Sequence, residues 1–262
     1  MAGKVIVVTS GKGGVGKTTT TANIGTALAQ KGHSVVLIDA DIGLRNLDVV
    51  MGLENRIVYN LVDVIEGKCR KQQAMIRDRK LSKLSIIPAA QTREKDAVSP
   101  EQMKELCEDL AKEFDFVFID CPAGIERGFR NAVAGAHTAL VVTTPEVSAI
   151  RDADRIIGLL EANLLHDVHL IVNRMNHKMV KKGDMMCTND IVSLLSIPLL
   201  GVVPDSEEVV ISTNRGVPLV HERGSKAGRA FQKIAARLDG EEVPIDEDQP
   251  NGIFGRFKRL WS

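Results

Sequence analysis

A glycine-rich segment near the start of the chain has the residue types and the spacing needed to hold a phosphate group. It reads Gly11-Lys12-Gly13-Gly14-Val15-Gly16-Lys17-Thr18-Thr19, with an apolar stretch at 5–8 before it and a helical pattern at 20–30 after it. The residues at 11–18 match G-x-x-x-x-G-K-[ST] in the strand-then-helix setting that this pattern requires. Glycines let backbone N–H groups converge on an anion, and the helix adds the positive end of its dipole. A glycine-rich turn without a ligand is the much weaker interpretation.

Three side chains of this segment have expected roles toward a nucleotide. Lys17 contacts the β- and γ-phosphates, the Thr18 hydroxyl binds Mg²⁺, and Thr19 reaches the α-phosphate. Lys12 is a second lysine that the pattern itself does not need. Taken alone, Lys12 has two equally favoured interpretations: a charge supplied across a dimer interface, or a solvated surface lysine.

Carboxylates follow two further apolar stretches. Asp39 and Asp41 come at the end of the stretch 35–38, and Asp120 directly follows 116–119. The carboxyl ends of parallel strands face the ligand crevice of an open sheet. Alternation places Asp39 and Asp41 on one side, where one carboxylate can hold the water shell of a metal and one can orient the attacking water. Asp120 fits the position that binds Mg²⁺ directly or through water, and the Pro- and Gly-containing segment after it suits a switch.

The elements that must position these residues are short apolar stretches separated by longer amphipathic segments. Continuous apolar stretches indicate strands that are buried on both faces, and they lie at 5–8, 35–38, 84–87, 116–119, 139–142, 169–172 and 199–203. Helical patterns lie between them, for example at 20–30, 100–112 and 153–165. This order predicts an α/β fold whose mostly parallel central sheet is flanked by helices on both faces, with right-handed crossovers. Together with the phosphate segment at 11–18, it predicts a single-domain P-loop NTPase.

Composition and charge exclude several classes of function. The 262-residue chain carries 34 Lys and Arg against 34 Asp and Glu, and this balance argues against bulk electrostatic capture by nucleic acid. None of the four cysteines belongs to a C-x-x-C pair or has a histidine at ligand spacing, which disfavours a zinc or iron–sulfur site and suits a reducing cytoplasm. The first apolar stretch is too short for a signal peptide, and no apolar stretch reaches the roughly 18 residues of a membrane span.

The end of the chain differs in character from the rest. Residues 241–250 are acidic and contain two prolines, which predicts a flexible linker after a P-loop domain at 1–240. Residues 251–262 carry three basic residues and no acid, and their apolar residues fall on one helical stripe that comprises Ile253, Phe254, Phe257, Leu260 and Trp261. We expect an amphipathic helix in the plane of a membrane, rather than one docked on the protein's own core. One such tail binds weakly, whereas two tails on a dimer would bind with avidity.

Several segments together resemble the MinD/ParA family of dimerising P-loop ATPases. Lys12, in the phosphate segment 12–19, is similar to the extra lysine of the family's deviant Walker A motif. The segments 39–48 and 120–126 resemble switch I and switch II, and the segment 144–154 is also similar. The amphipathic tail resembles that of the family as well, so the resemblance runs from about residue 3 to residue 262.

The resemblance implies roles for individual residues. Lys12 would reach the phosphates of the partner subunit, Asp41 would orient the hydrolytic water, and Asp120 would act in the Mg²⁺ shell. Contacts to the base would come from Asn173, Pro204 and Asp205. The chain has no N-K-x-D motif to support guanine, so ATP is the expected nucleotide. Regions that bind partner proteins in the family contain Arg45, Ser148, Arg151, Asp152 and Asp154, for which a solvated helix start with capping acids is equally favoured.

The function implied by the resemblance is control of the place of cell division. ATP would drive dimerisation and attachment to the inner face of the cell membrane by an otherwise cytoplasmic protein. The dimer would recruit a division inhibitor, and an activating regulator would stimulate hydrolysis and so release the dimer. Two alternatives need features that the sequence does not favour: a ParA-like DNA-partitioning ATPase needs a basic surface for DNA, and an iron–sulfur carrier needs paired cysteines.

Overall fold

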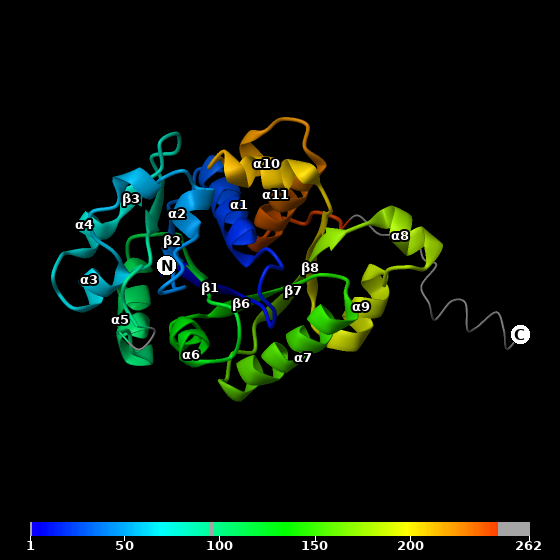
Figure 1. The fold of residues 1–262 in the computed structure, drawn as a ribbon, viewed down its shortest axis with the longest axis horizontal. Coiled ribbons are helices and arrows are strands. Elements are labelled where there is room, and N and C mark those ends of the chain that lie inside the picture. Colours follow the sequence, from blue (N-terminus) through cyan, green and yellow to red (C-terminus); the bar gives the residue numbers. More distant parts are fainter. Residues whose placement is uncertain (1, 95–96, 246–262) are drawn as a thin grey trace, which may run out of the picture.

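A single open sheet forms the centre of the molecule in the computed structural model, which describes residues 2–94 and 97–245. Within these residues the strand order is β3-β4-β2-β5-β1-β6-β7-β8 (Figure 1). All neighbouring strands are parallel except β3 and β4, which are antiparallel. The strands are β1 (Lys4–Thr9), β2 (Val35–Asp39), β3 (Ile76–Arg77), β4 (Leu84–Ile87), β5 (Phe116–Asp120), β6 (Thr138–Thr143), β7 (Val168–Met175) and β8 (Leu199–Pro204).

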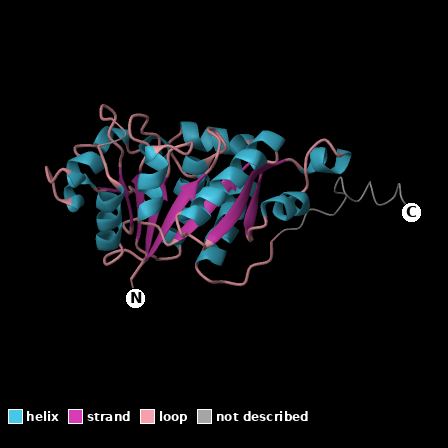
Figure 2. Ribbon diagram, turned by 90° about the horizontal axis from the view of Figure 1, so that it is seen from below, coloured by secondary structure: helices cyan, strands magenta, loops and turns pink. Residues whose placement is uncertain are grey.

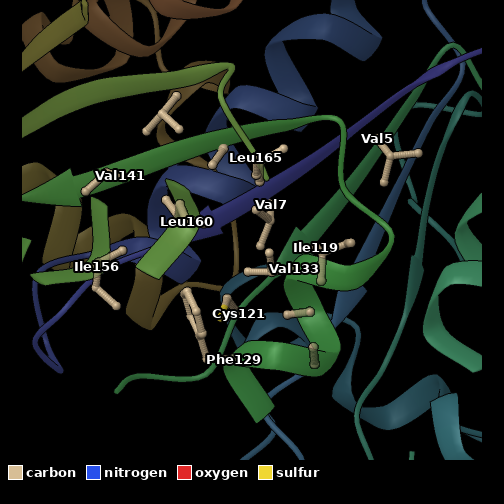
Figure 3. Close-up of a cluster of buried hydrophobic side chains, with 14 of the residues drawn as sticks. Val5, Val7, Ile119, Cys121, Phe129, Val133, Val141, Ile156, Leu160 and Leu165 are labelled. Carbon is tan, nitrogen blue, oxygen red and sulfur yellow. The ribbon is translucent and has the colours of Figure 1, made fainter. Parts of the chain in front are cut away.

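The apolar strands are buried because helices cover both faces of the sheet. In β1, Val5 and Val7 belong to one apolar cluster, whereas Ile6 and Val8 belong to another on the opposite face. Figure 3 shows Val5 and Val7 in the first cluster, together with Phe129 from the helix α6 (Arg127–Ala134). Complete burial of a side chain of this size contributes about 1.5–3 kcal/mol. Burial of both faces is therefore the reason that these strands read as continuous apolar stretches.

Two layers of helices enclose the sheet (Figures 1 and 2). One layer contains α1 (Lys17–Gln30), α2 (Leu47–Val50), α10 (Glu207–Asn214) and α11 (Lys226–Leu238). The other contains α3 (Leu61–Ile65), α5 (Pro100–Leu110), α6 (Arg127–Ala134), α7 (Val147–Ala162), α8 (His177–Lys182) and α9 (Thr188–Leu195). The remaining short elements are α4 (Lys71–Ala74) and two 3₁₀ turns, Glu54–Arg56 and Leu219–His221. None of the helices in the described part of the chain has the length and apolar character needed to cross a membrane.

The architecture confirms the predicted fold class and all seven predicted strands. The strand β3 was missed, because two residues are too few to show a pattern. The helix predicted at 153–165 begins earlier, at Val147, and ends at Ala162, where Asn163 closes the last turn and Leu164 adopts a positive φ of 61°. The first turn was missed because Val147 and Ser148 are exposed and so show no apolar periodicity.

The chain after α11 turns back onto the domain. The Arg237 guanidinium donates hydrogen bonds to the backbone carbonyls of Val243 and Pro244, at 2.7 and 2.6 Å. Lys31 also forms an ion pair with Glu241. Residues 241–244 of the predicted linker therefore lie against the ATPase domain. The remainder of that linker and the predicted membrane-binding residues Ile253, Phe254, Phe257, Leu260 and Trp261 lie outside the described residues.

Candidate nucleotide-binding site

The glycine-rich segment forms the loop between β1 and α1 at the carboxyl edge of the sheet. Gly16 precedes α1 with a φ of 101°, and Gly14 has a φ of 78°, so both need the freedom of glycine. A Cβ on Gly16 would also lie 2.3 Å from Nδ2 of Asn173, and a Cβ on Gly11 would lie 2.1 Å from the carbonyl oxygen of Asp152. The conformation of the loop is therefore constrained by its contacts with β7 and α7 as well as by anion binding.

Lys17 is held inside this loop by a residue that the sequence analysis did not single out. Its Nζ donates a hydrogen bond to Oγ of Ser10 at 2.9 Å, and that hydroxyl donates to the carbonyl oxygen of Lys12 at 2.8 Å. Both Ser10 and Thr9 before it are fully buried. The only signal in the sequence is a serine directly before the first glycine. Ser10 thus positions the lysine expected to contact the β- and γ-phosphates.

The predicted Mg²⁺ residues come together as expected. The Thr18 hydroxyl donates to Oδ2 of Asp120 at 2.6 Å, and the Thr21 hydroxyl donates to Oδ1 at 3.3 Å. Burial raises the pKa of Asp120, the nearby carboxylate of Asp39 raises it further, and the Thr18 hydrogen bond partly opposes these effects. A hydroxyl and a carboxylate beside a phosphate loop are oxygen ligands that Mg²⁺ prefers, with phosphates and waters completing its shell. These two side chains therefore fit the ion.

Asp39 and Asp41, which were expected to share the metal and water chemistry, have different environments. Asp39 is fully buried, and its carboxylate accepts hydrogen bonds from the backbone N–H groups of Asp41, Asn46 and Leu47, at 3.0, 3.0 and 3.1 Å. Burial raises the pKa of Asp39, and these hydrogen bonds oppose the rise. Asp39 thus holds the loop that follows β2. Asp41, two residues further on, is half-buried, and its role toward the attacking water remains a prediction.

The same loop contains a buried ion pair. Arg45 has a positive φ of 49°, and its Nε lies 3.1 Å from Oδ2 of Asp48, which is completely buried. Burial raises the pKa of Asp48, and the Arg45 charge opposes the rise. Arg45, predicted as a partner contact, is thus also part of the internal structure of the loop, with 19% of its side chain exposed.

The start of α7 lies directly beside the phosphate loop. Nζ of Lys12 is 3.2 Å from Oγ of Ser148 and 3.5 Å from Oε2 of Glu146, and 43% of the Lys12 side chain is exposed. Asp152 on the next turn packs against Gly11. Two of the predicted partner residues therefore touch the nucleotide site, while Arg151 and Asp154 on the same helix are exposed.

The predicted base contacts lie at the ends of β7 and β8. The Asn173 side chain is buried, donates to the carbonyl oxygen of Val15 at 2.8 Å and accepts from the backbone N–H of Arg174 at 2.9 Å. Asn173 therefore braces the phosphate loop in this structure. Pro204 ends β8, and the backbone N–H of Asp205 donates a hydrogen bond to the carbonyl oxygen of Met175. Their contact with a base remains a prediction.

The known proteins to which this chain is similar are nucleotide-binding proteins, in agreement with the phosphate loop. Residues 6–219 match the model of the CobQ/CobB/MinD/ParA nucleotide binding domain. The septum site-determining protein MinD of Synechocystis sp. is 57% identical over 259 residues, which cover 98% of this chain and 97% of that protein. The chain belongs to the MinD family. The residues that match the family model include the phosphate loop with its second lysine, Lys12, and the carboxylates at the ends of β2 and β5.

Two solved structures of MinD proteins have the same fold as this chain. The MinD of the MinC:MinD cell division protein complex from Aquifex aeolicus superimposes with a TM-score of 0.88 at 46% identity, covering 94% of this chain and all of that chain. The MinD of Pyrococcus horikoshii, solved with Mg-ADP, superimposes with a TM-score of 0.81 at 30% identity, covering 90% of this chain and 96% of that chain. A relative with this fold therefore holds Mg-ADP.

Proposed function

We propose that this chain is an ATPase that dimerises with ATP, binds the membrane surface and positions the division septum. The observation that carries the proposal is the pairing of a complete phosphate site with an exposed second lysine, Lys12, at its rim. A magnesium ion bound by Thr18 and Asp120 would neutralise charge on the phosphates. Lys17 would hold the β- and γ-phosphates, and Asp41 would orient the attacking water.

Lys12 is suited to act on the nucleotide of a second copy of the chain. Its contacts with Ser148 and Glu146 lie on the surface, and exposed ion pairs of this kind contribute only about 0–1 kcal/mol. The lysine can therefore leave them at little cost when a more strongly charged triphosphate approaches across an interface. Release of Lys12 would also free the start of α7, which carries the predicted partner residues Ser148, Arg151, Asp152 and Asp154.

Membrane association and partner binding complete the proposal. The predicted amphipathic tail would attach the otherwise cytoplasmic ATP dimer to anionic lipid on the inner face of the cell membrane. The similar MinD of Aquifex aeolicus was solved in complex with MinC, which supports a division inhibitor as a partner of this chain. A regulator that stimulates hydrolysis would return the dimer to monomers, and no specific nucleic acid is involved.

Light scattering coupled to gel filtration tests the dimer directly. The Asp41→Ala variant is used so that ATP persists, and the same protein with ADP is the control. We expect a species of twice the chain mass with Mg-ATP and a monomer with Mg-ADP. A monomer in both states at concentrations that saturate the site with nucleotide would refute the proposal.

A further inference from the structure

A basic groove follows the outer edge of the sheet in the described structure, along β8. It is a cavity of about 350 Å³ lined by His177, Val202, Pro204, Lys226, Arg229, Ala230, Lys233 and Arg237. Five of these side chains are basic or can become so, and none of the lining residues within the described chain is acidic. The volume is in the range of small-ligand sites. The groove therefore has the size and charge of a site for an anion.

The sequence of α11 produces this charge. Lys226, Arg229, Lys233 and Arg237 are spaced by three or four residues and so share one face, while Phe231, Ile234 and Leu238 bury the opposite face. Like charges at this spacing destabilise a helix by about 0.2–0.5 kcal/mol per pair. An anion in the groove would offset that repulsion.

The groove is separate from the phosphate loop. β8 is the last strand on its side of the sheet, and β7 and β6 lie between it and β1, which carries the loop. Pro204 alone belongs both to the groove and to the predicted base contacts. The charges of α11 therefore do not serve the phosphates held by Lys17.

The position at which the described chain ends links the groove to the membrane. Arg237 bridges the β8 carbonyl of Leu200, at 2.7 Å, and the carbonyls of Val243 and Pro244. The path from residue 245 to the predicted tail at 251 is six residues, which extend over at most about 20 Å. A tail lying on a membrane would thus keep the groove close to the lipid headgroups.

We propose that the basic groove binds the phosphate of an anionic phospholipid headgroup and forms a second membrane contact beside the tail. The inference rests on the proposed membrane association. Lys226, Arg229 and Lys233 line the groove and supply its charge, and Arg229 also donates a hydrogen bond to the carbonyl oxygen of Gly224 at 3.0 Å. Arg237 mainly holds the wall of the groove through its three carbonyl contacts. The contact would also fix the orientation of the protein on the membrane, which a flexibly attached tail alone does not.

The test compares two full-length double variants that lose the same charge. The groove variant is Lys226→Gln/Lys233→Gln, and the control is Lys104→Gln/Lys112→Gln, at or just after α5, toward the opposite end of the sheet (Figure 1). Sedimentation with Mg-ATP is measured on vesicles of phosphatidylcholine with and without phosphatidylglycerol. We expect the groove variant to bind the anionic vesicles about tenfold more weakly than wild type, and the control to bind within about twofold of wild type.

Several outcomes would overturn the inference. If wild type binds anionic vesicles and the groove variant matches the control, the groove is not a lipid site but membrane association stands. If wild type binds no vesicle at all, the proposed function fails as well. If the groove variant no longer binds a fluorescent ATP analogue, the groove is assigned to nucleotide. If soluble glycerol phosphate stabilises wild type in a thermal melt without competing with vesicles, the groove is assigned to soluble phosphate. If wild type binds DNA in a salt-sensitive manner and the groove variant does not, the groove is assigned to DNA.

Discussion

At the scale of single residues, two carboxylates that lie side by side in the sheet have different hydrogen-bond partners and different structural roles. Asp39 and Asp120 are register partners on β2 and β5. Asp39 accepts three backbone N–H groups and fixes the loop after β2, whereas Asp120 accepts the hydroxyls of Thr18 and Thr21. Desolvation raises the pKa of Asp120 to about 7 and the pKa of Asp39 to about 6. Ionising both in the absence of a cation is therefore unfavourable.

This arrangement predicts the pH dependence of stability without nucleotide. A carboxyl whose pKa is higher in the folded than in the unfolded protein favours folding while protonated, and this contribution is lost as the pH rises through the folded-state pKa. The nucleotide-free protein should therefore lose stability as the pH rises from about 4 to about 7. Asp120→Asn should melt a few degrees higher than wild type near pH 8, with a flatter profile, in calorimetry. Asp154→Asn on the exposed face of α7 is the control, and an Asp120→Asn profile parallel to wild type would contradict the assignment.

The second lysine gives another prediction at this scale. Lys12→Ala should bind a fluorescent ATP analogue within about threefold of wild type, because in the monomer Lys12 contacts α7 rather than the predicted ligand. Its regulator-stimulated hydrolysis should fall by about 10³-fold, the magnitude found for a charge supplied in trans. Lys17→Ala should instead lose nucleotide binding, and Lys104→Ala should behave as wild type. Normal turnover of Lys12→Ala would rule out the trans role.

At the scale of elements, the phosphate loop depends on α7 for its shape. Gly11→Ala would place a Cβ 2.1 Å from the carbonyl oxygen of Asp152, whereas a Cβ on Gly13 meets Ala123 at an ordinary 3.8 Å. We expect Gly11→Ala to lower the free energy of unfolding of the nucleotide-free protein by about 1–3 kcal/mol and Gly13→Ala to change it by less than about 1 kcal/mol. Urea denaturation measures both. Equal effects would show that the loop and α7 are not tightly packed.

Most of the elements were predictable because their pattern is local. Strands buried on both faces leave continuous apolar stretches, and the phosphate loop is a contiguous motif between β1 and α1. The contacts of Asn173 with Val15 and of Lys12 with Ser148 join residues more than 130 positions apart, so no local pattern encodes them. For the same reason the local pattern did not separate the roles of Asp39 and Asp41, and only the family resemblance singled out Asp41. The difference arises from where the chain after β2 folds back.

At the scale of the whole molecule, the balanced charge of the chain conceals opposed regions. The basic stripe of α11 faces the groove beside β8, and the acidic residues of the predicted linker follow directly after residue 240. A single tail with a few interfacial side chains binds a membrane weakly, because the ordering of about 12 residues offsets much of the gain. In the proposed function, dimerisation would make the second insertion intramolecular and so multiply the affinity. Nucleotide state would thereby be coupled to location.

Vesicle sedimentation of the full chain with Mg-ATP and with Mg-ADP tests this coupling most directly. Anionic vesicles, wild type and a variant that ends at residue 250 are compared at one protein concentration. The account predicts binding at least about tenfold stronger with ATP than with ADP, and loss of the ATP-dependent binding in the truncated chain. Equal binding in the two nucleotide states, or undiminished binding without residues 251–262, would contradict it.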